Sequence, residues 1–404
     1  MGRFTLILIV AFAVVAGGMR LNHGRLARDA QDTSNAKFVE TTVRNITNSA
    51  VYMTLRQIAQ NFNWRTGYSN LALLNGTVDV NLEDSSTDTT LDLNQVRITA
   101  DASFSAETST AVVLVSKSAF SEFAYFTDVE PLIWFITGDT LMGPIHTNGQ
   151  FHIWGNPVFY GRVSSVASSW YGTGNPEFKA GTAFGIPEIQ LPIDLSILEG
   201  KAQDGGSFFE GDVSIEFLAD GTFNWSVYHM QGTTMVIDSS GNVVIDETNG
   251  VIATQDGYDL RVKGTLDGQA TMLSGDDVWI DDDVLYNQNP LTDPTADDML
   301  GIISKKNIYF TDNVPNRSNL TINATLMALD SKITAQNYNT GTPRGELFIL
   351  GGLVQKERGA VGTFSGGVIQ TGYRKKYVYD QRFLTQAPPF YPVFSKNTIV
   401  SWYE

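Results

Sequence analysis

The stretch from Gly138 to Val163 most constrains the fold, because its turn signals leave no room for a long helix or strand. Turns are predicted at Gly143-Pro144, Asn148-Gly149 and Gly155-Asn156-Pro157. Short strands between tight corners are typical of β-solenoids, in which each turn of chain stacks on the one before. Apolar side chains alternate with polar or small neighbours, as in half-buried strands, at Ile145, Phe151, Ile153, Val158 and Tyr160.

The same pattern returns after residue 250 and continues almost to the C-terminus, with no helical periodicity between the short apolar runs. It predicts a mainly β protein whose head, residues 132–404, is a right-handed parallel β-helix, with a β-sandwich as the alternative. Hairpin signals around Asp220-Gly221 and Ser240-Gly241 indicate an antiparallel excursion within about 164–247. The inward-facing candidates after residue 250 are Val262, Leu266, Met272, Val278, Ile280 and Leu285.

A second segment, residues 63–131, alternates strongly between Thr77 and Ser118. This pattern predicts a small antiparallel sheet. A preceding helix would cover one face of that sheet, which gives an α+β arrangement.

The N-terminal segment, residues 1–62, is predicted to be a helical stem. Its uninterrupted apolar run, Phe4 to Ala16, is shorter than the ~20 residues of a standard membrane span. One interpretation is a secretory signal peptide, with Arg3 as the basic region and a cleavage site after Ala16. The alternative is that the run stays on the chain and is buried by lipid or by other copies.

Asp32 to Asn61 contains neither proline nor glycine and predicts a helix of about 30 residues. A heptad-like stripe runs along it, at Val39, Val43, Ile46, Ala50 and Met53. We expect the C-terminal half of this stripe to pack on the chain's own β-rich part. A looser segment around Gly17, Gly18 and Gly24 is expected to join the two helical parts.

Charge divides the chain into a basic stem and an acidic head. The net charge is −16, and residues 1–70 hold 8 Lys and Arg against 3 Asp and Glu, which leaves 19 against 40 in residues 71–404. Such an excess of acid disfavours nucleic acid as a partner. The chain has no cysteine, so disulfides and thiolate metal sites are excluded.

An apolar N-terminal helix that continues into an amphipathic helix and a β-rich head resembles a type IV pilin. In that family the apolar helices bundle into the filament core. A prepilin site has Gly followed by Phe or Met, with Glu at the fifth mature position. Here Arg3 follows Gly2, and the fifth position is Thr5 or Ile7.

The head also resembles an uncharacterised bacterial family of PilX-like, pilus-associated proteins. The resemblance rests on GPIHTNGQFHIWGNPVFYGRV, DDMLGIISKKNIYF, NLTINATLMAL and YDQRFLTQAPPFYPV, and it covers most of residues 130–404. It implies a cell-surface filament, a membrane-inserted N-terminus before assembly, and pilus assembly machinery of the inner membrane as a partner. It implies no catalytic residues.

These observations predict a structural subunit that polymerises with itself through its apolar helix. Arg20, Arg25 and Arg28 would lie just outside the filament core and pair with acids of neighbouring subunits. The core-forming candidates are Phe4, Leu6, Ile7, Leu8, Ile9, Val10, Phe12, Val14 and Val15. A minor pilin or tip adhesin, and a secreted β-helix enzyme acting on polysaccharide, are the alternative functions.

The sequence offers little catalytic chemistry, and neither an enzyme activity nor a cofactor is predicted. Nucleophile-elbow, zinc-protease, P-loop and dinucleotide motifs do not occur. His146 and His152 lie six residues apart, and we expect His146 to make hydrogen bonds within a turn. Five carboxylates are weak candidates for Ca²⁺, although solvated acidic corners explain them as well: Asp276, Asp277, Asp281, Asp282 and Asp283.

Overall fold

The computed structural model describes residues 2–84, 87–88, 90–91, 95–232, 234–365 and 368–404. They form two compact units, one of residues 1–116 with 397–404 and one of residues 117–396. The first unit therefore takes in the expected stem together with most of the segment expected at 63–131. The second unit begins at Lys117, earlier than the expected boundary at residue 132.

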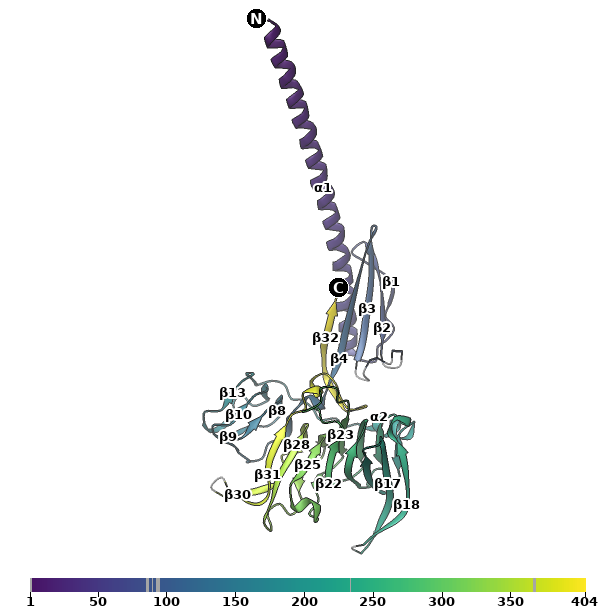
Figure 1. Ribbon diagram of the computed structural model, residues 1–404, viewed down its shortest axis with the longest axis vertical. Coiled ribbons are helices and arrows are strands. Elements are labelled where there is room, and N and C mark those ends of the chain that lie inside the picture. Colours follow the sequence, from purple (N-terminus) through teal and green to yellow (C-terminus); the bar gives the residue numbers. More distant parts are fainter. Residues whose placement is uncertain (1, 85–86, 89, 92–94, 233, 366–367) are drawn as a thin grey trace. The chain divides into compact units, whose positions relative to one another are not determined.

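One helix, α1 (Gly2–Gln60), dominates the first unit (Figure 1). Its 59 residues span about 90 Å at 1.5 Å per residue. The expected looser segment is absent from it, since Gly17, Gly18 and Gly24 are helical. Helix interiors tolerate glycine at about 1 kcal/mol each, and the apolar and straight-chain residues around these glycines favour the helix. From Phe4 onward the helix is long and apolar enough to cross a membrane. Signal sequences near an N-terminus meet the same criterion of length and apolar composition.

The C-terminal half of α1 packs on a sheet through a continuous buried stripe. Three members of the predicted heptad, Val43, Ile46 and Ala50, are buried there. Met53 is exposed, contrary to the prediction, and Thr54 and Ile58 are buried instead. A straight helix drifts about 20° per heptad from a strict seven-residue repeat, so the buried face moves from position 53 to position 54.

The sheet beneath this stripe has five strands in the order β1-β2-β3-β4-β32. The pairs β1–β2, β2–β3 and β3–β4 are antiparallel, which agrees with the predicted small antiparallel sheet. Its strands are β1 (Tyr68–Leu73), β2 (Gly76–Glu83), β3 (Gln95–Phe104), β4 (Glu107–Ala119) and β32 (Val393–Tyr403).

The second unit is built on a ten-stranded sheet whose neighbouring strands are all parallel within the described residues. A β-sandwich, the alternative prediction, consists of antiparallel sheets and therefore does not match this parallel sheet. In spatial order its strands are β14 (Thr182–Phe184), β11 (Val163–Ser165), β8 (Ile145–Thr147), β5 (Tyr125–Val129), β29 (Leu353–Glu357), β26 (Thr325–Ala328), β23 (Met299–Ser304), β21 (Gln269–Ser274), β19 (Val251–Thr254) and β15 (Ser207–Phe209).

A second, eleven-stranded sheet is mixed. Its hairpins β16–β17–β18 and β30–β31 are antiparallel, and its other pairs are parallel. Its strands are β18 (Thr234–Val244), β17 (Thr222–Gln231), β16 (Asp212–Leu218), β20 (Leu260–Leu266), β22 (Val278–Tyr286), β25 (Leu320–Asn323), β28 (Pro343–Leu350), β31 (Val368–Val378) and β30 (Gly362–Ser365), with β24 (Ile308–Phe310) beside β22 and β27 (Ile333–Ala335) beside β24.

Two three-stranded parallel sheets complete the first part of this unit. They are formed by β6 (Phe135–Ile136), β9 (His152–Gly155) and β12 (Tyr171–Gly174), and by β7 (Thr140–Leu141), β10 (Val158–Phe159) and β13 (Glu177–Phe178). Strands β11 to β14 continue this stack, so residues 164–184 do not belong to the expected excursion. Within the described part of the expected excursion, the antiparallel pairs are β16–β17 and β17–β18.

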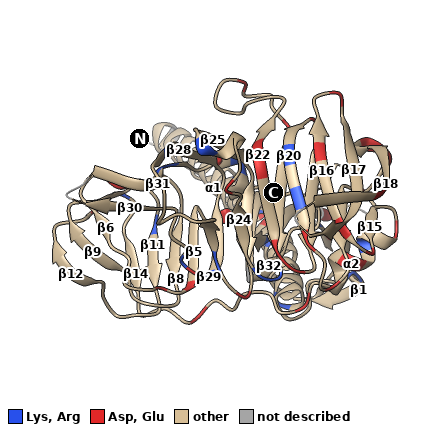
Figure 2. Ribbon diagram, turned by 90° about the horizontal axis from the view of Figure 1, so that it is seen from below, with Lys and Arg blue, Asp and Glu red and all other residues tan. Residues whose placement is uncertain are grey.

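The strand order reveals how the chain runs through the second unit. Strands β5, β8, β11 and β14 advance toward one edge of the ten-stranded sheet. The chain then crosses through α2 (Ser196–Gln203) and restarts at the opposite edge with β15. The later strands return until β29 pairs with β5, so two half-stacks meet in the middle of one sheet (Figure 2).

One core cluster lies between the two large sheets, and another covers the opposite face of the ten-stranded sheet, where α2 packs. Of the inward candidates, Val262, Leu266, Met272, Val278 and Ile280 are buried as expected. Leu285 is only partly buried, because the alternation of β22 places Val284 and Tyr286 inward. Likewise Phe159 is buried where Val158 and Tyr160 were expected.

Candidate functional site

The first half of α1 presents the candidate assembly segment. All nine predicted core-forming side chains, from Phe4 to Val15, are exposed, with exposed fractions between 53% and 86%. None belongs to a hydrophobic cluster of the described residues. The structure thus gathers these side chains on one uncovered apolar rod.

The candidate arginines lie on the same helix, just beyond the rod. Arg20, Arg25 and Arg28 are exposed. No ion pair within the described residues involves any of them. Their guanidinium groups are therefore available to an external acid.

The five candidate carboxylates do not converge on one point. Asp276 is ion-paired with Lys306, and Asp277 accepts hydrogen bonds from the backbone and side-chain nitrogens of Asn307. Asp281 is held by Arg261 through two nitrogens and by the Thr311 hydroxyl. Asp282 accepts from the backbone of Asp283, whose own carboxylate accepts from the Thr321 amide.

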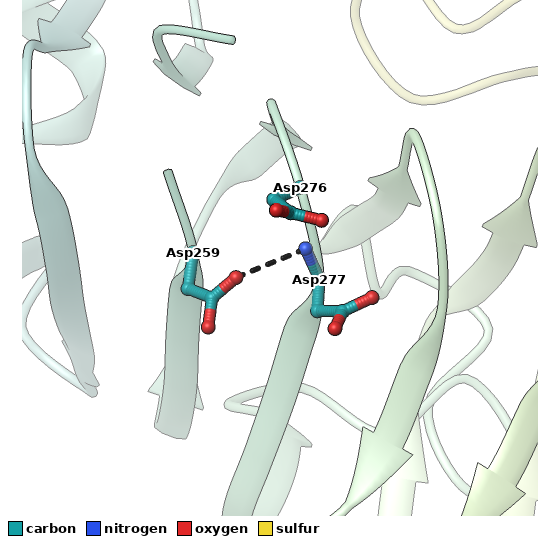
Figure 3. A group of neighbouring side chains, drawn as sticks. All are labelled: Asp259, Asp276 and Asp277. Atoms are coloured by element: carbon teal, nitrogen blue, oxygen red, sulfur yellow. Dashed lines mark hydrogen bonds between the residues drawn. The ribbon is translucent and has the colours of Figure 1, made fainter. Parts of the chain in front are cut away.

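Asp276 and Asp277 do approach a third acid, Asp259, which the sequence analysis missed (Figure 3). One ligand atom from each of the three lies within 4.8 Å of the others. Leu260 pairs with Val278 across parallel strands, so the residue before each strand also meets its neighbour. The register between β20 and β22 brings Asp259 close to Asp277, and the sequence alone does not show that register.

The environment of Asp259, Asp276 and Asp277 explains the cluster without a cation. Asp259 accepts hydrogen bonds from the Asp277 amide and from Trp279 Nε1 at 2.9 Å, while Lys306 neutralises Asp276. Burial raises the pKa of Asp259, opposed by those two hydrogen bonds. Oxygen ligands of this kind suit a hard cation, yet each carboxylate already has a donor.

The two histidines of the sequence analysis have separate surroundings. His146 is buried, with Nε2 2.8 Å from Asn148 Oδ1 and Nδ1 2.9 Å from Ser164 Oγ. The predicted hydrogen bond within the turn is confirmed. Burial lowers the pKa of His146, so the ring is neutral near pH 7. His152 packs against Trp134 and Tyr171.

A family described as a domain of unknown function (DUF4900) matches residues 90–168, which is less than half of the chain. The structure is similar to the competence-associated pilin ComZ from Thermus thermophilus, at a TM-score of 0.36 and 10% identity, over 90% of this chain and 97% of that chain. No curated protein matches. A TM-score this low does not establish a shared fold, so function has to be argued from the chain's own geometry.

Proposed function

We propose that this protein is the structural subunit of an extracellular, type IV pilus-like filament. The observation that carries the proposal is the uncovered apolar rod of α1, which continues without a break into a helix packed on its own sheet. A filament core needs a helix that is apolar where copies meet. It also needs firm attachment to the folded part of each subunit.

The energetics favour burial of the rod. Exposed apolar area of this extent is costly in water, and burial contributes roughly 25 cal/mol per Å². Lipid would cover the segment in the membrane-inserted subunit, and other copies would cover it in the assembled homopolymer. The transfer from lipid to filament is the step for which inner-membrane pilus machinery is the expected partner.

Charge supports the same arrangement. Arg20, Arg25 and Arg28 follow the apolar segment, and the part of the chain after residue 70 is strongly acidic. In a staggered helical assembly the arginines of one subunit would meet acids of its neighbours. Each exposed pair would contribute little, typically below 1 kcal/mol, so the pairs set register more than strength.

The β-rich head is proposed to be an acidic display surface with a β-helix architecture and no enzymatic activity. Successive parallel strands such as β8, β11 and β14 stack at intervals of 18 and 19 residues, as the turns of a β-helix do. Glycan cleavage that depends on Asp276, Asp277, Asp281, Asp282 or Asp283 would instead favour the polysaccharide-acting alternative. A minor or tip subunit would share the same helix chemistry.

The test is a charge substitution in the rod. Leu8 and Val10 are 70% and 53% exposed and belong to no hydrophobic cluster of the described residues, so replacing both by Asp leaves the folded core untouched. Leu8→Asp/Val10→Asp should abolish filaments, seen by electron microscopy of sheared surface material, because two carboxylates cannot be buried unpaired in the core.

A matched control carries the same charge change farther along α1. Gln31→Asp/Ala36→Asp lies at exposed positions beyond the apolar run and should leave filaments intact. Circular dichroism should show both variants to be as folded as the parent. Polymerisation of Leu8→Asp/Val10→Asp, or a mature protein that begins near Gly17, would contradict the proposal.

A further inference from the structure

A row of side chains crosses the outer face of the eleven-stranded sheet. Arg261 on β20 pairs in register with Trp279 on β22, which pairs with Tyr309 on β24, which pairs with Thr334 on β27. Their neighbours Ile280 and Phe310 point into the core. Since parallel strands lie about 4.8 Å apart, the row offers one side chain every 4.8 Å.

The first three members of the row are stacked. The Arg261 guanidinium carbon lies 5.5 Å from the centre of the Trp279 ring, and the Trp279 and Tyr309 rings are 4.6 Å apart at an angle of 24°. Trp279 is also fixed by its bond to Asp259. Both faces of Trp279 are thus covered, whereas Tyr309 has a neighbouring ring on one face.

The other face of Tyr309 is directed toward Thr334, where the stack has a vacant place. Threonine is too short to form a fourth layer, and its hydroxyl is turned away to donate to the Ala360 carbonyl. A cavity of about 400 Å³ opens at this place. Its lining includes Tyr309, Thr334, Gln336, Asn337, Tyr338 and Lys332.

The walls of the cavity are rich in hydrogen-bonding groups. Three side-chain amides line it, and Glu357 adds a carboxylate. The amides belong to Gln336, Asn337 and Asn339. Arg358 forms the floor, where it is held by Glu130 and lies 4.1 Å from the centre of the Phe135 ring. A ligand that fits must combine a flat apolar face with a rim of donors and acceptors.

We propose that this cavity binds one ring of an uncharged glycan, a hexopyranose stacked on the open face of Tyr309. The apolar C–H face of a pyranose would occupy the fourth layer of the Arg261–Trp279–Tyr309 stack. Its hydroxyls would bond Asn337, Lys332 and Glu357. The adjoining units of the oligosaccharide would extend into solvent, because the cavity is open to the surface.

Charge selects this ligand over a nucleobase, which would also stack on tyrosine. Asp259, which accepts a hydrogen bond from Trp279, lies close to Asp276 and Asp277 (Figure 3), and acidic residues lie along β22 (Figure 2). With a net charge of −16, the molecule repels a polyanion. Gln336 and Asn337 each already form a hydrogen bond with Asp312, but an apolar peptide side chain that covered the Lys332 ammonium would leave that group without a partner, which costs free energy.

The experiment measures binding of neutral oligosaccharides to the full-length protein in detergent. The four probes are tetrasaccharides, one each of glucose, galactose, mannose and N-acetylglucosamine. Isothermal titration calorimetry measures their binding. At least one should bind saturably at millimolar concentration or below. Tyr309→Ala should weaken that binding about tenfold, equivalent to about 1.4 kcal/mol, and Tyr309→Phe should retain it.

Further variants separate the cavity from a general loss of structure. Lys332→Ala removes a rim donor without touching the stack and should also weaken binding. Tyr171→Ala, at an exposed tyrosine of β12 outside the cavity, should not. Binding by none of the four probes, or binding indifferent to both Tyr309→Ala and Lys332→Ala, would overturn the proposal. Filament formation is independent of either outcome.

Discussion

Glu130 and Arg358 form an ion pair that joins the two half-stacks of the second unit. Their side chains are 0% and 6% exposed, and Arg358 Nη1 donates to Glu130 Oε1 at 3.0 Å. The carboxylate also accepts hydrogen bonds from the hydroxyls of Tyr125 and Thr127. The pair therefore spans the junction of β5 and β29, where strands more than 220 residues apart in the chain meet.

Breaking this pair should destabilise the second unit strongly. Arg358→Met leaves the Glu130 carboxylate buried without its cation, which typically costs 3–5 kcal/mol. Urea denaturation should show that loss in the free energy of unfolding. Glu130→Leu in addition should restore part of it, since an apolar pair replaces the buried charge.

Lys263 and Glu216 provide the exposed comparison, with side chains 41% and 44% exposed. Lys263→Met should change the free energy of unfolding by less than about 1 kcal/mol. Equal effects of Lys263→Met and Arg358→Met would mean that burial does not decide the strength of the Glu130–Arg358 pair.

Single residues also show what the sequence can and cannot predict. Ile145, Phe151 and Ile153 face inward as period-2 alternation predicts. The alternation misplaces Tyr160 because the turn at Gly155-Asn156-Pro157 resets which face is inward. Asp259 was missed because its proximity to Asp277 depends on register between strands that no local pattern records.

At the scale of elements, glycines at the corners allow successive turns of chain to stack closely. A Cβ on Gly161 would lie 1.9 Å from the Gly143 carbonyl oxygen, a backbone atom that cannot move aside freely. Gly161→Ala should therefore lower the melting temperature of the second unit, monitored by circular dichroism, because the two corners must separate.

Gly200 in α2 is the matched control, since a Cβ there meets nothing within 4 Å. Gly200→Ala should leave the melting temperature unchanged or raise it. Alanine stabilises a helix interior over glycine by roughly 0.5–1 kcal/mol of folding free energy. A stable Gly161→Ala protein would show that the stack can absorb a methyl group at this corner.

The elements themselves were predicted unequally. The helical stem, its packing half and the antiparallel sheet follow from periodicity, which is strong over long segments. The predicted excursion wrongly includes most of strands β11 to β14, because the frequent Ser and Gly of this stretch carry no clear strand pattern. Their hydrogen bonds come from the preceding turn of chain, and a local propensity does not contain that information.

At the scale of the whole molecule, the return of the chain from β14 to β15 could not have been predicted. The sequence contains both half-stacks but no signal that β29 completes a sheet by joining β5. Long-range strand pairing is decided by which edges remain open after local folding. The uneven charge, in contrast, is read directly from the sequence and bears on assembly.

The last prediction concerns that charge. Residues 71–404 carry 19 basic against 40 acidic side chains, so in the proposed filament neighbouring heads would repel one another. The screening length falls from about 10 Å at 0.1 M salt to about 3 Å at 1 M. Added NaCl should therefore increase lateral bundling of filaments, measured by light scattering and electron microscopy. Single filaments should persist, because burial of the Phe4–Ala16 rod is apolar and does not weaken with salt.

Leu8→Asp/Val10→Asp should remain unassembled at every salt concentration, since screening does not remove the cost of burying two carboxylates. Dissolution of filaments by salt would show instead that the pairs made by Arg20, Arg25 and Arg28 hold the subunits together.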